Sequence, residues 1–147
     1  MSTNLPSLTQ EGLDRVKKIE ELTSREEQLK VTTNHLLHAG MYFRTIYLTK
    51  GELIVGALIK IPTVVIINGN VNIYLGDKVL NAEGYCVLPA SAGRKQVIAA
   101  LEDTEFTMCF PTKAKTIEEA EEEFTDEYSR LLSREDTSIN NIIITGE

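Results

Sequence analysis

Basic and polar side chains in two short segments are the strongest candidates for chemistry in this sequence. In the first segment, MYFRTIYL, strand-like alternation gives one face four side chains: Tyr42, Arg44, Ile46 and Leu48. Because two of the four are apolar, we expect this face to point inward and to carry Arg44 with it. A buried arginine needs an acceptor, which is either an anionic ligand or a carboxylate of the protein such as Glu52 or Glu83.

The second segment, GYCVLPASAGRKQ, places three polar residues after a glycine. Arg94 and Lys95 follow Gly93 in a turn whose backbone N–H groups suit an anion. The alternative is an ordinary solvated loop. The expected contacts of a bound anion are, in order of importance, Arg44, Arg94 and Gln96, the last as a neutral donor.

Other candidates for a reactive site are weaker. His35 and His38 are the two histidines, and their spacing could place both on one helix face, but no acidic or thiol ligand is near them in sequence. Packing or surface roles are the default for both. The chain has no G-x-S-x-G nucleophile motif, no Walker lysine and no Rossmann glycine pattern. The acidic run at 118–123 is typical of a solvated helix face.

Composition narrows the class of protein. The 147 residues are 42% hydrophobic and 25% charged, as in an ordinary globular domain, and we expect residues 1–147 to form a single domain. A net charge of −7 argues against partners such as a nucleic-acid polymer or an anionic membrane. Cys86 and Cys109 lie in apolar runs and are expected to be buried thiols. Without an apolar leader or membrane-length run, the protein is expected in the cytoplasm.

Local patterns predict a mainly β fold with flanking helices. The expected parts are N-terminal helices over 7–30, a connector over 31–40, a barrel of short strands over 41–112, C-terminal helices over 116–134 and a strand-like tail over 138–147. A second short helix is expected to begin at Ser24. Asn68, Gly69 and Asn70 are the predicted turn of the clearest hairpin. The apolar tail should pair with its own sheet or with another subunit, which predicts a homo-oligomer.

The middle segment resembles the cupins, which are small double-stranded β-helix barrels. GMYFRTIYLTKGELIVGALIK is similar to the start of the first cupin motif. GYCVLPASAG is similar to the glycine–proline–glycine frame of the second motif. The resemblance covers about half the chain and is nearest to short cupin-like proteins encoded by bacteriophages, which would place the protein in the host cytoplasm.

This sequence departs from the family at its metal site. Cupin metal sites use a His-x-His pair and a glutamate in the first motif and a histidine in the second. The corresponding places hold residues that do not bind divalent metals: Lys60, Ile61, Pro62 and Thr63 in the first, and Arg94, Lys95 and Gln96 in the second. We therefore expect no metal, no cofactor and no metal-dependent activity.

Three functions remain open. The first is a non-enzymatic protein that binds a small anionic molecule, for example a phage anti-defence protein that sequesters a nucleotide immune signal. In that case phosphate would pair with Arg44, Arg94 and Lys60, and a base would stack on Tyr42, Tyr74 or Tyr85. The second is a metal-independent epimerase or lyase acting on a sugar nucleotide or small acid, which needs a general base such as His35, His38 or Tyr85. The third is a structural virion or assembly protein.

Overall fold

A curved eight-stranded sheet forms the body of the protein in a computed structural model, which describes residues 4–23 and 31–147. The strand order is β3-β6-β4-β7-β2-β1-β8, and β5 pairs with β4 outside this path. Neighbouring strands are antiparallel except β1 and β8, which are parallel. The strands are β1 (Thr33–His38), β2 (Met41–Leu48), β3 (Leu53–Val55), β4 (Thr63–Tyr74), β5 (Val79–Ala90), β6 (Val97–Ala100), β7 (Thr104–Pro111) and β8 (Asn140–Ile144).

Strand β4 gives the sheet its curvature. One edge of β4 pairs with β5 along its whole length, while its other edge pairs first with β7 and then with β6. Gly69, with φ of 150°, lies where the partner changes, and a Cβ there would stand 2.2 Å from Thr104 Oγ1. The chain therefore bends at a position that excludes a side chain. The predicted turn at 68–70 is wrong, because the chain reverses at residues 75–78, where Leu75 N donates to Lys78 O at 2.9 Å.

The predicted connector over 31–40 is also wrong, because most of it forms strand β1. Burial alternates along the strand, with Thr33, His35 and Leu37 buried. Alternation sends His35 and His38 to opposite faces, so the helix-face interpretation fails. The buried His35 has a hydrogen-bond partner at each ring nitrogen, because Nδ1 lies 2.7 Å from Tyr42 Oη and Nε2 lies 2.8 Å from Asn140 Oδ1.

Helical segments flank the sheet at both ends, as predicted. Helix α1 spans Gln10–Thr23, and the second helix expected at Ser24 lies outside the described residues. Helix α2 spans Ile117–Phe124 and is capped by Thr116, whose hydroxyl accepts from Glu119 N at 3.2 Å. The remaining segments are short: η1 (Tyr128–Arg130), α3 (Leu132–Glu135) and η2 (Thr137–Ile139). No helix in the described part of the chain is long and apolar enough to cross a membrane.

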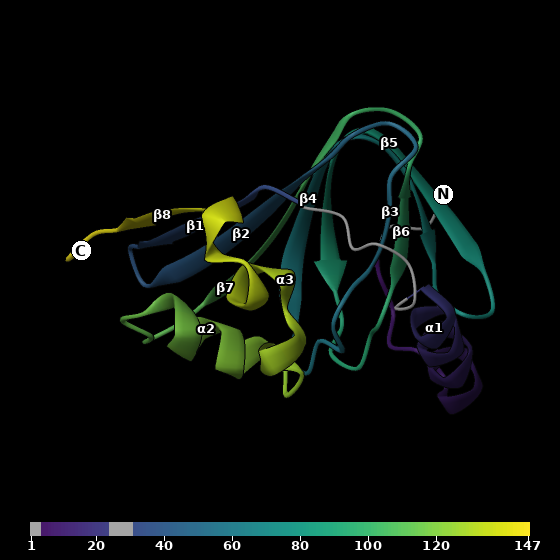
Figure 1. Cartoon of the computed structure of the whole chain (residues 1–147), viewed down its shortest axis with the longest axis horizontal. Coiled ribbons are helices and arrows are strands. Elements are labelled where there is room, and N and C mark those ends of the chain that lie inside the picture. Colours follow the sequence, from purple (N-terminus) through teal and green to yellow (C-terminus); the bar gives the residue numbers. More distant parts are fainter. Residues whose placement is uncertain (1–3, 24–30) are drawn as a thin grey trace.

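The helices pack at different places on the sheet. Figure 1 shows α1 at the end where β4 turns into β5, while α2 and α3 lie beside β7 and β2. Two hydrophobic cores result. One fills the curved sheet around Val65, Ile67 and Ile73, and the other packs Tyr42 and Phe110 against Phe124 of α2. Between these cores, η1 and α3 approach the open side of the sheet. A cavity described below lies between them and the sheet.

The mainly β prediction with helices at both ends is confirmed, in the form of a cupin-like half-barrel. The tail forms strand β8, which pairs with β1 of its own sheet and projects to one side with the C-terminus at its tip (Figure 1). The side chains of Ile142, Ile143 and Ile144 remain exposed there. Pairing with another subunit, and the single-domain organisation, stay predictions.

Candidate functional site

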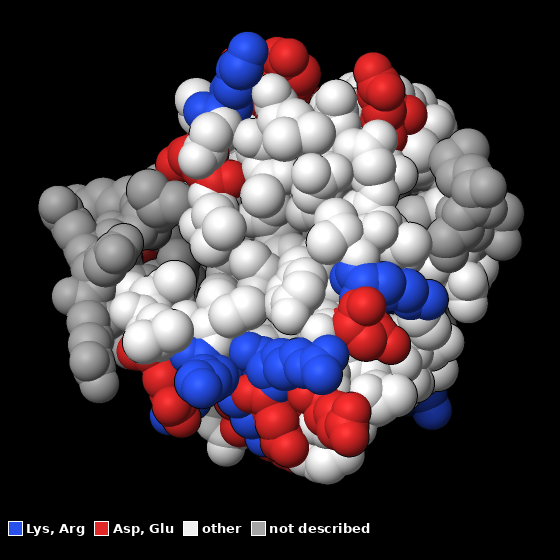
Figure 2. All heavy atoms as spheres, turned by 90° about the vertical axis from the view of Figure 1, so that its right-hand side faces the viewer, with Lys and Arg blue, Asp and Glu red and all other residues white. Residues whose placement is uncertain are grey.

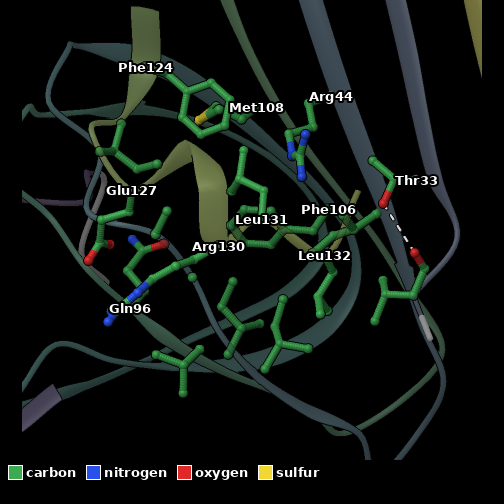
Figure 3. Close-up of a pocket in the computed structure, with 18 of the residues that line it drawn as sticks. Thr33, Arg44, Gln96, Phe106, Met108, Phe124, Glu127, Arg130, Leu131 and Leu132 are labelled. Atoms are coloured by element: carbon green, nitrogen blue, oxygen red, sulfur yellow. Dashed lines mark hydrogen bonds between the residues drawn. The ribbon is translucent and has the colours of Figure 1, made fainter. Parts of the chain in front are cut away.

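A cavity of about 180 Å³ opens between the half-barrel and the C-terminal segments. Residues of β2, β3, β6 and β7 form its floor, and residues of η1 and α3 lie over it. Much of the wall is apolar: Ile46, Ile54, Ile98, Phe106, Met108 and Leu131. Figure 3 shows Arg44 on one side of the cavity and Gln96 and Glu127 on the other, with Leu131 and Phe106 between them. The site therefore combines an apolar interior with a few polar groups, as ligand sites do.

The segment after Gly93 is buried, so the solvated-loop interpretation is wrong. Gly93 N donates to Ile59 O at 2.7 Å, Ile59 N to Arg94 O at 2.9 Å, and Gly56 N to Gln96 O at 2.9 Å. This pairing extends the chain, so side chains two residues apart share one face. Arg94 and Gln96 consequently both line the cavity.

Arg94 is a buried cation that has no counter-ion in the described part of the chain. Its side chain is 1% exposed, Nη1 donates to Ser91 O at 2.8 Å, and Nη2 donates to Thr63 Oγ1 at 2.6 Å. Nε has no hydrogen-bond partner, and within residues 4–23 and 31–147 no carboxylate forms an ion pair with this guanidinium. Burial lowers the pKa of Arg94 to about 10, which still leaves it charged at neutral pH.

Gln96 presents a second unpartnered donor to the same cavity. The residue is 7% exposed, and its Nε2 is buried without a hydrogen-bond partner in the described structure. A buried N–H that lacks an acceptor costs about 1–3 kcal/mol of desolvation. Two such groups on adjacent inward positions are unusual, because almost all buried polar groups in proteins are paired.

Arg44 lines the cavity but already has an acceptor within the protein. Its Nη1 lies 3.0 Å from Glu121 Oε2 and its Nη2 donates to Ser133 Oγ at 2.9 Å. The internal partner is therefore neither Glu52 nor Glu83. Glu121 is itself buried, while the other glutamates of the acidic run are exposed as predicted, and its second oxygen accepts from Arg134 Nη2 at 3.0 Å.

Lys95 does not line the cavity, but its ammonium pairs with two residues that do. The ammonium is fully buried and lies 2.9 Å from Glu20 Oε2 of α1 and 2.8 Å from Glu127 Oε1. Burial of Glu127 acts to raise its pKa, but the hydrogen bonds from Lys95 and from Leu58 N outweigh it and the pKa is lowered. Glu20 and Glu127 line the cavity and were not predicted, because nothing in the sequence links residues this far apart.

The structure does not bring the other four predicted ligand contacts into the cavity wall. Tyr42 lies behind Arg44, with its hydroxyl 3.4 Å from Arg44 Nη1. Tyr74 Oη donates to Gly76 O at 2.9 Å. Tyr85 is 71% exposed on β5, and Lys60 pairs with Asp126 at 2.7 Å.

Charged side chains outside the cavity are mixed in sign on the face that Figure 2 shows. Lysine and arginine side chains lie next to aspartates and glutamates there, around a largely uncharged centre. The unpaired positive charge is thus an internal feature of the cavity at Arg94, rather than part of a basic patch on that face.

A metal ion of the cupin type does not fit the residues present. In the described part of the chain, no three His, Cys, Asp or Glu side chains converge in a way that could hold a metal. The groups that line the cavity include the guanidinium of Arg94 and the amide of Gln96, and a buried cation repels a divalent ion. The site instead offers N–H donors and positive charge, which suit an anion.

This protein is similar to known proteins in structure and not in sequence. No family profile and no curated protein match the sequence. Among solved structures, a cupin-2 domain protein from Shewanella frigidimarina is 13% identical, with a TM-score of 0.45, over 63% of this chain and 91% of its own. A cupin superfamily protein from Desulfitobacterium hafniense is 18% identical, with a TM-score of 0.47, over 63% and 88%.

An RmlC-like cupin with a double-stranded β-helix fold, from Methanocaldococcus jannaschii, is 17% identical, with a TM-score of 0.46, over 59% of this chain and 85% of its own. Because these TM-scores lie below 0.5, the description of the chain as a cupin-like half-barrel depends on its own strand order and on the curvature at Gly69.

Proposed function

We propose that this protein is a non-enzymatic binder of a small anionic molecule, held in the cavity of the half-barrel. The observation that carries the proposal is the pair of donors without partners in the described structure, Arg94 Nε and Gln96 Nε2, on two residues that line that cavity. An anion would supply the acceptor that each donor lacks and the negative charge that Arg94 lacks.

The energetic argument compares the empty and the filled site. A buried cation without a counter-ion is costly, and a site that keeps one gains from any acceptor able to reach it. Hydrogen bonds to charged groups contribute about 1.5–3 kcal/mol each, more than neutral ones. Selection for stability alone would favour an apolar side chain at Arg94, so the retained charge supports a role in binding.

The finer hypothesis of a phage anti-defence protein that sequesters a nucleotide immune signal in the host cytoplasm depends on the bacteriophage resemblance alone. A metal-independent epimerase or lyase would need a general base at the cavity. Its two carboxylates, Glu20 and Glu127, are held by Lys95, and His35 does not line it. The reading as a structural virion protein gives no reason for the charge at Arg94.

Native mass spectrometry of untagged protein tests the proposal. Protein purified in a volatile ammonium buffer, without added carboxylates or phosphate, should carry a small molecule that is absent after denaturation. The Gln96→Leu variant should retain less of it, while Gln10→Leu, the same change at an exposed position of α1, should retain as much as wild type. A cavity that stays empty in both purified protein and protein incubated with cell extract would contradict the proposal.

A further inference from the structure

We infer that the anion is a monocarboxylic acid with a compact apolar body, and not a phosphate or a nucleotide. This inference rests on the proposed binding function and specifies its ligand class. Three independent features of the cavity support it: the number of uncompensated charges, the number of free donors, and the composition and size of the wall.

The charges around the cavity leave one cation uncompensated. Three arginines line it, but Arg44 pairs with Glu121 at 3.0 Å and Arg130 lies 3.9 Å from Glu20. Within the described chain, Arg94 is the cavity-lining arginine that forms no ion pair. A ligand with a single negative charge would neutralise this site. A phosphate monoester carries about −1.5 to −2 charges at neutral pH and would leave part of its charge buried and unmatched.

Two carboxylates at the rim add to this discrimination. Glu20 and Glu127 line the cavity, and both pair with the ammonium of Lys95, which does not line it. A second negative charge on the ligand would therefore meet glutamates rather than free cations. Like charges brought together in a poorly solvated site are mutually destabilising.

The free donors match a carboxylate in number. Arg94 Nε and Gln96 Nε2 are the two buried side-chain donors that lack partners in the described structure. A carboxylate has two oxygens, so each of the two donors can bond a different oxygen. The three terminal oxygens of a phosphate group would need further donors, but Arg44 Nη1 and Nη2 are already bonded to Glu121 and Ser133.

Most of the remaining wall is apolar, and the charged residues in it are already paired within the protein. Aliphatic and aromatic side chains such as Ile54, Ile98, Phe106 and Leu131 form most of it. Its volume of about 180 Å³ is smaller than the roughly 300–1,000 Å³ of sites for drug-sized ligands. Burial of an apolar body against these residues supplies affinity that the single charge contact alone would not.

Isothermal titration calorimetry with a matched set of probes tests the inference. Hexanoate and phenylacetate carry the charge and an apolar body, acetate carries the charge alone, and hexanol carries the body alone. Inorganic phosphate and adenosine monophosphate represent the rival class. We expect one-to-one binding of hexanoate or phenylacetate, with affinity for acetate, hexanol, phosphate and the nucleotide weaker by about tenfold or more.

Two variants locate the binding. Gln96→Leu removes one free donor and should weaken carboxylate binding about 10- to 100-fold, while raising the melting temperature of the free protein because a buried unpaired group is lost. Arg94→Lys keeps the charge but removes the planar donor and should also weaken binding. Gln10→Leu, outside the cavity, should match wild type.

The outcomes separate the ligand class from the binding function. If phosphate or the nucleotide binds better than the carboxylates and Gln96→Leu abolishes that binding, the proposed function stands and the monocarboxylate inference is overturned. If carboxylates bind equally well to wild type, Gln96→Leu and Arg94→Lys, the cavity is not their site and the inference is overturned. If no probe binds, the monocarboxylate inference is overturned, and the proposed function is then decided by whether native mass spectrometry finds a retained small molecule.

Discussion

Arg44 Nη1 lies 3.0 Å from Glu121 Oε2, and this ion pair joins strand β2 to helix α2 at one wall of the cavity. Ser133 extends the link, because its hydroxyl accepts from Arg44 Nη2 and donates to Glu121 Oε2 at 2.7 Å. The contact explains how the C-terminal segments are held over the open side of the half-barrel. It also gives Arg44 a structural role that is separate from ligand binding.

Arg44→Ala should destabilise the protein, because it leaves the Glu121 carboxylate buried with fewer partners. Breaking a buried ion pair by removing one member typically costs about 3–5 kcal/mol, and the remaining contact with Arg134 should bring the loss toward the lower value. Urea denaturation measures the loss. Lys50→Ala breaks an exposed pair with Glu102 and should change stability by less than about 1 kcal/mol. Equal stabilities of Arg44→Ala and wild type would contradict the structural role.

The Glu127 contacts predict a dependence of stability on acid. The folded-state pKa of Glu127 is lowered from 4.5, so its charge stabilises the fold above that value. This contribution is lost as pH falls from 4.5 through the lower folded value, because the native state then takes up the proton. Glu127→Gln should therefore have a lower melting temperature than wild type at pH 7, and the difference should shrink below pH 4.5. A difference that is constant from pH 7 to about 3 would argue against the ion pair with Lys95.

Gly76→Ala should loosen helix α1 from the barrel. Gly76 has φ of 89°, and a Cβ there would stand 2.3 Å from Gly12 Cα of the helix. Overpacking of this kind costs about 1–3 kcal/mol, and the positive φ adds to the strain. Because the helix packs less tightly in this variant, hydrogen exchange of α1 amides should accelerate. The same loosening should disturb Glu20, which α1 carries to the cavity. Gly40→Ala, with φ of 69° and open space around it, is the control for the backbone effect alone.

The exposed apolar side chains of strand β8 lead us to expect self-association. This strand is the last of the sheet, and its exposed isoleucines, Ile142 to Ile144, carry no charge that would oppose pairing with a second copy. Antiparallel pairing of two identical edges satisfies both strands equally, as a two-fold axis requires. Light scattering should give a mass above 16.4 kDa, and Ile143→Lys should reduce it. A monomer at high micromolar concentration would refute the homo-oligomer.

The sequence predicted features that depend on local patterns. The strand content of the middle segment and the helix that follows it at the C-terminal side are set by residue type and spacing, and the structure has both. Strand β1 was missed because its polar residues hide the alternation. His35 is buried through partners that lie 7 and 105 residues away in the chain.

The part of the candidate site that depends on local sequence patterns was also predictable. Alternation around Arg44, and the position of Arg94 and Gln96 after a glycine, placed three of the seven predicted contacts at the cavity. The pairing of Arg44 with Glu121 could not be predicted, because it spans 77 residues and depends on how α2 packs. Lys60 and the three tyrosines match an anionic ligand by their chemistry alone, and chemistry does not determine where a side chain points.

The most direct test of the central claim is the NMR signal of the Arg94 Nε–H group in a titration with hexanoate. Assigned proton–nitrogen spectra of arginine Nε–H and glutamine amide groups report each donor separately. We expect the Arg94 Nε–H and Gln96 amide signals to move to the positions typical of charged hydrogen bonds and to saturate together, with the dissociation constant found by calorimetry. If hexanoate binds while both signals stay in place, or if hexanoate, phosphate and nucleotide all leave them unchanged, the cavity does not bind an anion through these donors.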